Sequence, residues 1–200
     1  MCNDYGNRIP YSAYVEEFSQ IRLPVVIPEP GRAPNLEPRD DIRPTDPAPV
    51  IRRAEGGVEL AQMRWGFDPG RPKAPPVINF RSEGRRFPAE KRVLVPASWF
   101  FEFTGEKYPK TKWKFTVEGE DWFCFAGLWR PGEEGQPDRF TILTTAPGPD
   151  IAPYHDRQLV VLRRDQWAAW LDGSLPEEEL LKPAPAGTLR VEQASQPKDQ

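Results

Sequence analysis

Cys2 follows the initiator Met1 directly and is one of only two cysteines in the 200 residues. Removal of Met1 would expose an α-amine and a thiol on adjacent carbons, a pair that no internal residue offers. An α-amine has a pKa of about 7.7–8.0, against about 10.4 for lysine, so a useful fraction is neutral near pH 7. A neutral amine can attack an aldehyde, and the thiol can then close a five-membered thiazolidine. The alternative interpretation is an incidental cysteine in a loose terminus.

Three further side chains are of types suited to such chemistry. Glu102 interrupts the apolar run SWFFEF, and a carboxylate among aromatic rings is desolvated, which raises its pKa and suits it to acid/base work. The alternative for Glu102 is a polar strand face that meets water. His155, the single histidine, could shuttle protons near neutrality or be an exposed loop residue. Asn79 could orient an amine or a sugar oxygen, although asparagine also favours turns.

A tryptophan and a basic run could contact nucleic acid. Trp65, in RWGFDPG, could stack on a base, although core packing is the commoner role of a tryptophan. The net charge of −3 argues against broad attraction to nucleic acid. The stretch 81–92 nevertheless has a local charge of 5 − 2 = +3, and it indicates either a basic site or a solvated loop. Its basic residues are Arg81, Arg85, Arg86, Lys91 and Arg92, against Glu83 and Glu90.

The bulk properties indicate a single globular domain. The chain has 200 residues and is 38% hydrophobic and 12% aromatic, which excludes a disordered protein. It has no apolar run of about 18 residues and no apolar signal segment near Met1, so we expect a cytoplasmic protein without a membrane span. Two distant cysteines and one histidine predict free thiols, with no metal site and no cofactor. We expect a monomer.

The pattern of residues predicts many strands and few helices. Strands are expected over 49–53, 58–65, 92–103, 112–118, 122–129, 139–145, 158–162 and 189–193. Helices are expected over 10–19, with Tyr14, Val15 and Phe18 on one side, over 164–172, ending at Gly173, and over 175–182, with a capping box from Ser174 and Glu177.

Because most strands follow one another without helices, the sheet should be largely antiparallel. We therefore predict one α+β domain over 1–193 with a curled sheet or barrel, a few short peripheral helices and a flexible tail over 194–200. The proline-rich stretch 27–49 is expected to be a long connection on the domain surface.

Together these features resemble the SOS response-associated peptidase (SRAP) family, in the family's order and over most of the chain. The matching segments are Met1-Cys2, the proline-rich 35–52, RWGFDPG at 64–70, INFRSE at 78–83, RVLVPASWFFEF at 92–103, FAGLW at 125–129 and TILTTAPGPDIAPYHDR at 141–157. The combination of Cys2 with an N-x-R-x-E segment, a late-strand glutamate and an HDR segment is the specific part of the resemblance.

The resemblance implies a protein that recognises abasic sites in single-stranded DNA and cross-links to them through its N-terminal cysteine. Cys2 resembles the nucleophile, Asn79 the residue that positions the amine and the opened sugar, and Glu102 the acid/base residue. His155 resembles the histidine that assists proton transfer and reversal of the cross-link. The resemblance also implies DNA contacts by Arg81, Arg157, Arg85, Arg86 and Trp65, and association with the nucleoid when the protein is bound to DNA.

The chain departs from the family near its start. Many members begin Cys-Gly-Arg-Phe, where this chain has Asn3, Asp4 and Tyr5, and many have Tyr-Asn where this chain has Asp40 and Asp41. Asp4 is expected to weaken DNA binding, since a carboxylate near phosphates repels them. Two other functions stay open: a cysteine peptidase that uses Cys2 and His155, and a noncatalytic reader of DNA or modified bases.

Overall fold

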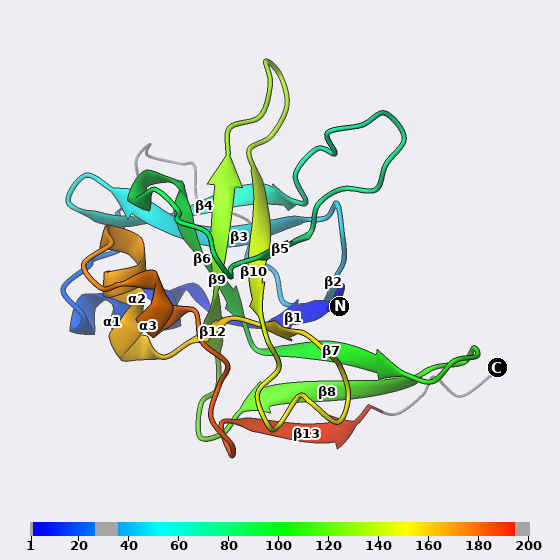
Figure 1. Ribbon diagram of the computed structural model, residues 1–200. Coiled ribbons are helices and arrows are strands. Elements are labelled where there is room, and N and C mark those ends of the chain that lie inside the picture. The colour runs from blue at the N-terminus through cyan, green and yellow to red at the C-terminus, as the bar shows by residue number, and fades with distance from the viewer. Residues whose placement is uncertain (1, 27–35, 195–200) are drawn as a thin grey trace.

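In the described part of the chain, two β-sheets make up most of the structure, with three short α-helices gathered at one side (Figure 1). This computed structural model describes residues 2–26 and 36–194. The smaller sheet is antiparallel throughout and has five strands in the order β13, β8, β7, β1, β2. Their bounds are β1 Tyr5–Asn7, β2 Arg39–Ile42, β7 Trp99–Thr104, β8 Thr111–Val117 and β13 Leu189–Gln193.

The larger sheet has eight strands in the order β11, β10, β4, β3, β6, β9, β12, with β5 paired to β10. Strand β10 pairs with β9 as well as with β4, so the sheet is strongly curled, although it does not form a closed barrel. The bounds are β3 Pro47–Ala54, β4 Gly57–Trp65, β5 Asn79–Arg81, β6 Arg92–Ala97, β9 Phe123–Arg130, β10 Arg139–Thr145, β11 Gln158–Leu159 and β12 Val161–Leu162. The α+β class with a curled sheet is confirmed. The sheet is mixed, because β10 runs parallel to β4 and β5.

The curled sheet is buried on both faces, which explains the continuous apolar runs in its sequence. Side chains alternate along a strand, so Val93 and Val95 of β6 join the core between the two sheets, while Leu94 joins the core under the helices. The helices are α1 Tyr11–Gln20, α2 Arg164–Asp172 and α3 Glu177–Leu180, and a short 3-10 helix, η1, spans Ala89–Lys91.

Two predicted strands are divided in the structure. The prediction of one strand over 92–103 is wrong, because the chain leaves the larger sheet at Ser98, whose N–H donates to Gly6 O, and enters the smaller sheet as β7. The stretch 158–162 is likewise split, since β11 pairs with β10 and β12 pairs with β9. Strands β1, β2 and β5, of three or four residues each, were not expected.

Two helix details are corrected. On α1, Tyr14 and Phe18 are buried as predicted, but Val15 is 40% exposed. The expected capping box is wrong: α3 begins after Pro176, and the Glu177 side chain bonds to Phe87 and Arg92 instead of the helix end. Helix α2 has its predicted bounds, and Gly173 has the predicted left-handed conformation with φ 73°.

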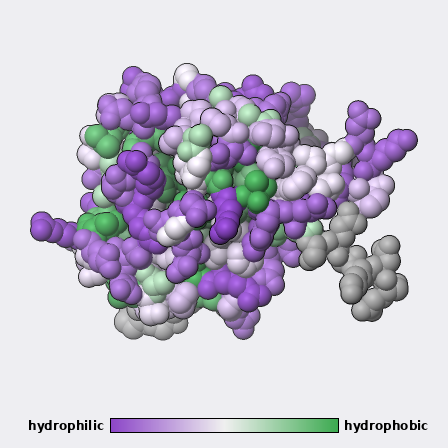
Figure 2. Space-filling model, turned by 90° about the horizontal axis from the view of Figure 1, so that it is seen from below, coloured by the Kyte–Doolittle hydropathy of each residue, from purple (hydrophilic) through white to green (hydrophobic). Residues whose placement is uncertain are grey.

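Part of the expected proline-rich surface connection, 27–35, lies outside the described residues, and so do 195–200 of the expected tail. The rest of the connection is more ordered than expected, because it contributes β2 and the start of β3. Within the described chain, no helix has the length and apolar character needed to cross a bilayer. Figure 2 views the molecule from the side of the smaller sheet and shows mostly hydrophilic side chains, with hydrophobic ones in small separate patches.

Candidate active site

Cys2 lies just before β1, and this short strand carries it to the smaller sheet. Strand β1 pairs with β7 through Tyr5 opposite Phe100, and the Asp4 carbonyl accepts the Phe101 N–H at 3.0 Å. Cys2 is only 1% exposed, and its Sγ donates to the Asp4 carbonyl at 3.3 Å. The ladder between β1 and β7 therefore fixes Cys2 beside the next residue of β7, Glu102.

Glu102 is buried, at 2% exposure, and accepts a hydrogen bond from the backbone N–H of Cys2. Burial raises the pKa of this carboxyl to about 7, because a charge among aromatic side chains loses its hydration. The alternative of a polar strand face turned to water is therefore wrong for Glu102. Near neutral pH the group is divided between its acid and base forms, which suits proton transfer in both directions.

Asn79 begins β5 and reaches the same cysteine from the other sheet. Its Nδ2 donates to the Cys2 carbonyl at 2.7 Å. Its Oδ1 is buried and has no hydrogen-bond partner among the described residues, so it is an acceptor that a bound molecule can use. The turn interpretation of Asn79 is not supported, since the residue lies in a strand that pairs with Ile142 of β10.

His155 follows a turn after β10, and its side chain is 20% exposed. Its Nδ1 lies 2.9 Å from both the Arg157 N–H and Asp156 Oδ1. Burial lowers the pKa of the imidazole, which favours the neutral ring with Nδ1 as the acceptor for Arg157. The preceding Tyr154 packs on Trp113 with ring centroids 4.9 Å apart, and this contact ties the turn to β8.

A cavity of about 590 Å³, which we call the reaction cavity, lies beside these groups. Glu102 and His155 line it, and Cys2 contacts this wall through the hydrogen bond from its N–H to Glu102. Its other lining residues are Asn3, Asp4, Arg43, Pro44, Phe103, Tyr108, Lys110 and Lys112. Cys2, Asn79, Glu102 and His155, which are spread over most of the sequence, thus meet where the two sheets come together.

The Cys2 thiol is held in its protonated form. Burial raises its pKa, and the negative charge of the nearby Glu102 raises it further. A thiol activated as a thiolate needs a nearby cation or a helix N-terminus to lower its pKa. The surroundings of Cys2 therefore act against thiolate formation.

A charged cluster beside the cavity was not expected from the sequence. Lys112 Nζ lies 2.8 Å from Asp4 Oδ2 and 3.0 Å from Asp41 Oδ1, and it stands 3.6 Å from the centre of the Phe101 ring. The Asp4 side chain is 6% exposed, so it points at Lys112 and not into solvent. The expectation that Asp4 confronts DNA phosphates is therefore corrected. Only a lysine within the aromatic segment KWKF hinted at this cluster.

The expectation that Trp65 faces DNA is corrected by its position in the structure. Its ring is fully buried, stacks on Phe140 and donates from Nε1 to the Ile78 carbonyl at 2.9 Å, so it belongs to the core. Arg157 forms a two-pronged ion pair with Glu83, with N–O distances of 2.6 and 2.8 Å.

Arg81, Arg85 and Arg86 are exposed on β5 and the following loop, as a contact surface requires. Arg92, part of the basic run, is buried instead and bonds to Glu177.

Comparisons with known proteins agree on one family. The model of the SOS response associated peptidase (SRAP) family matches residues 1–197. The abasic site processing protein YoqW of Bacillus subtilis (strain 168) is 26% identical over 92% of this chain and 89% of its own length. The abasic site processing protein YedK of Escherichia coli (strain K12) is 25% identical over 78% of this chain and 75% of its own.

Solved structures share the fold. A Bacteroides thetaiotaomicron protein has a TM-score of 0.71 at 18% identity, over 97% of this chain and 92% of its own. A phage-related protein of Bordetella bronchiseptica has a TM-score of 0.71 at 22% identity, over 98% of this chain and 95% of its own. At this level of identity the likeness extends to the fold alone.

Proposed function

We propose, on the premise that this chain belongs to the SOS response associated peptidase (SRAP) family, that it processes abasic sites in single-stranded DNA through a covalent adduct with Cys2. The names of its relatives YoqW and YedK support an abasic-site substrate. The observation that carries the proposal is the hydrogen bond from the Cys2 backbone nitrogen to the Glu102 carboxylate. Removal of Met1 turns this nitrogen into an α-amine that already lies beside an acid/base group.

The chemistry follows from the two nucleophiles of Cys2. An abasic deoxyribose exists as a closed hemiacetal in equilibrium with an open aldehyde. The amine attacks the aldehyde carbon, and the loss of one water gives an imine. The thiol sulfur then adds to the imine carbon while its proton passes to the nitrogen, which closes a thiazolidine. Closure removes the imine that β-elimination needs, so the adduct protects the strand from breakage.

The neighbouring residues supply the proton transfers and the orientation. Glu102, with a pKa of about 7, gives a proton to the leaving hydroxyl and takes one from the amine. Asn79 holds the Cys2 carbonyl, and its unpartnered Oδ1 is available to the amine or to a sugar hydroxyl. His155, neutral and on the same cavity, assists proton transfer at the sugar and in the reversal of the cross-link.

The raised pKa of the Cys2 thiol supports this order of steps. A cysteine peptidase needs a thiolate and an imidazolium in the resting enzyme, whereas burial here favours the neutral thiol and the neutral imidazole. In the proposed reaction the amine attacks first, and the thiol acts on an imine carbon that is already activated. We therefore favour the cross-linking function over the peptidase.

The test uses the full chain and a single-stranded oligonucleotide with one abasic site. We expect a heat-stable adduct whose intact mass equals protein without Met1 plus oligonucleotide minus one water. Cys2→Ala should abolish it, and Cys2→Ser should give no thiazolidine. The matched control is Cys124→Ala, since Cys124 is the other buried thiol and lies in the core under the helices.

Two outcomes would contradict the proposal. A stable adduct that persists in Cys2→Ala would exclude Cys2 as the nucleophile. Binding of intact modified DNA by both wild type and Cys2→Ala, without any adduct to abasic DNA, would favour the noncatalytic reader.

A further inference from the structure

A second cavity, of about 410 Å³, lies beside β5 and away from Cys2. Among the residues that the structure describes, its lining includes four basic side chains and no acidic one, in a protein whose net charge is −3. We call it the basic pocket. It is lined by Phe67, Phe80, Arg85, Arg86, Phe87, Pro88, Lys91, Leu128, Trp129 and Arg130.

The basic pocket and the contact with Cys2 lie on opposite faces of one short strand. In β5, Asn79 contacts Cys2, and the next residue, Phe80, points to the opposite face because side chains alternate along a strand. Phe80 lines the basic pocket. Strand β5 pairs only with β10 among the described strands, so it is an edge strand, and a bound chain can pass around it from one site to the other.

Cations stand over aromatic rings inside the pocket. Arg85 lies 4.6 Å from the Phe80 ring centre, Arg130 lies 4.5 Å from that of Phe67, and Lys91 lies 5.1 Å from that of Trp129. In the part of the chain that the structure describes, no ion pair joins Arg85, Lys91 or Arg130 to a carboxylate. These three charges are therefore not neutralised by the protein itself. A ring with a cation above it suits a ligand with both a negative charge and a flat face.

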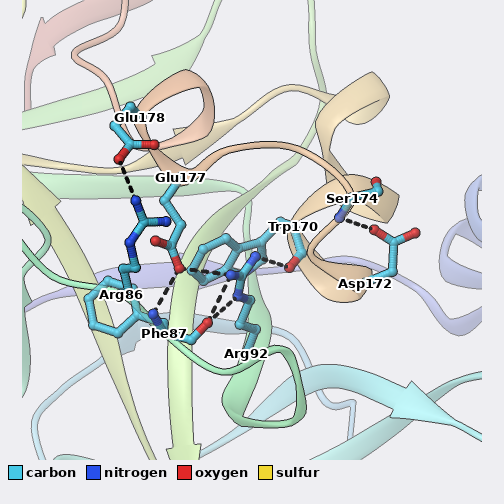
Figure 3. A network of polar contacts seen from close by, with 8 residues as sticks. All are labelled: Arg86, Phe87, Arg92, Trp170, Asp172, Ser174, Glu177 and Glu178. Atoms are coloured by element: carbon cyan, nitrogen blue, oxygen red, sulfur yellow. Dashed lines mark hydrogen bonds and ion pairs between the residues drawn. The ribbon is translucent and has the colours of Figure 1, made fainter.

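One wall of the pocket is fixed from behind by a buried ion pair (Figure 3). The Phe87 N–H donates to Glu177 Oε1 at 2.8 Å, and the Phe87 carbonyl accepts from Arg92 Nε and Nη2 at 3.0 and 2.8 Å. Arg92 and Glu177 bond to each other at 2.8 Å and are both buried. Phe87 is thus held in position before any ligand arrives, which lowers the entropic cost of binding.

We propose that the basic pocket binds a nucleotide that flanks the abasic one in the same DNA strand. Its phosphate lies against Arg85, Lys91 and Arg130, and its base or sugar packs against the parts of the half-exposed Phe80 and Trp129 side chains that these cations leave uncovered. This inference rests on the proposed function. It assigns a role in strand binding to Lys91, Trp129 and Arg130, which lie outside the reaction cavity.

The test measures cross-linking rates at limiting protein for oligonucleotides that carry none, one, two or three nucleotides on one side of the abasic site. One series varies the 5′ side and the other the 3′ side. In the wild type, one series should show a rate gain on the order of tenfold once the flank reaches the pocket. For the double variant Lys91→Gln/Arg130→Gln, the rate on the long oligonucleotides should be no higher than the rate of the same variant on the shortest one.

The control is Arg190→Gln, an exposed arginine of β13 in the other sheet, which should keep the full gain. Lys91→Glu is a second variant, and its added repulsion should lower the rate for long flanks alone. A gain that the double variant retains would overturn the proposal.

A further arm of the experiment adds free deoxynucleoside monophosphate as a competitor. If the pocket takes a flanking nucleotide, this competitor should slow the long oligonucleotides and not the shortest one. If it slows neither, the proposal is overturned. A failure of the wild type to cross-link even the longest oligonucleotide would instead refute the proposed function, so the two failures are distinguishable.

Discussion

Glu102 combines two properties that a surface carboxylate lacks, a raised pKa and a direct contact with the nitrogen of Cys2. Alternation along β7 turns Glu102 to the same face as the fully buried Phe100. The burial that removes water from Glu102 leaves its carboxylate in hydrogen-bond contact with the Cys2 N–H. The group is thus placed to exchange a proton with the Cys2 nitrogen.

Substitution Glu102→Gln keeps the size of the side chain and removes its titration. Wild-type cross-linking should first rise with pH as the α-amine loses its proton, and then fall above about pH 7 as Glu102 loses the proton that dehydration requires. In Glu102→Gln the rate should drop about a hundredfold or more, and the fall above pH 7 should disappear. The measurement is the adduct yield against time, from pH 5.5 to 9.

The matched control is Glu106→Gln, at an exposed carboxylate just after the same strand, and it should keep the wild-type profile. If the decline above pH 7 persists in Glu102→Gln, another group donates the proton, and Glu102 loses its assigned role.

The sequence was informative about residues with unusual neighbours in the chain. A glutamate inside SWFFEF predicted a desolvated carboxylate, and its burial is confirmed. The same reasoning was ambiguous for Trp65, because a sequence does not tell which ring faces the core. Lys112 was missed because its partner Asp4 lies 108 positions away, and no local pattern reports such a pair.

At the scale of elements, the strand β1 positions the reactive Cys2, which lies just before it, although the strand has only three residues. It is held between β2 and β7, and Gly6 lets it approach closely, since a Cβ there would lie 2.2 Å from the Trp99 ring. Lys112 adds a second attachment by binding Asp4 and Asp41 at once. Burial raises the pKa of Asp4 to about 6, in spite of this lysine.

Substitution Lys112→Met should therefore loosen the segment that presents Cys2. It leaves the buried Asp4 charge without its cation and should lower the free energy of unfolding by about 2 kcal/mol at pH 8, a figure reduced for the partial exposure of Lys112. The loss should shrink toward pH 4, because a protonated Asp4 no longer needs a cation in the folded state. Urea unfolding at both pH values measures it.

Lys110→Met, on the same cavity, is the control and should change stability little at either pH. An equal loss at pH 4 and pH 8 would show that Lys112 acts by packing alone. By the same reasoning, Asp4→Arg should not improve DNA binding, since it would bury a second cation against Lys112.

The elements that the sequence predicted well are those with strong local patterns. The strand over 139–145 and the helix over 164–172 have their expected bounds, because a stretch rich in β-branched residues and a helix end at Gly173 are local signals. Strands β1, β2 and β5 carry no alternation over their few residues and exist through pairing with distant segments. Two of these three strands carry or position the candidate site.

At the scale of the whole molecule, two cores lie on either side of the curled sheet, one shared with the smaller sheet and one with the helices. The C-terminal helices are tied to this sheet by Arg92 of β6 and Glu177 of α3. Arg92 also donates to the Trp170 carbonyl at 3.1 Å and lies over the Trp170 ring. One side chain thus links β6, both C-terminal helices and the loop that bears Phe87.

Substitution Arg92→Met should destabilise the entire fold. It leaves Glu177 buried without a cation and removes both donors to the Phe87 carbonyl, so the free energy of unfolding should fall by about 3–5 kcal/mol. Thermal unfolding followed by circular dichroism should show one transition at a lower Tm.

The control is Arg8→Met, which breaks an ion pair of 2.6 Å whose side chains are 56% and 58% exposed. Its Tm should barely change, because solvent already screens that pair. Equal shifts in the two variants would mean that burial gives the Arg92–Glu177 pair no special weight, and the fixed wall of the basic pocket would lose its physical basis.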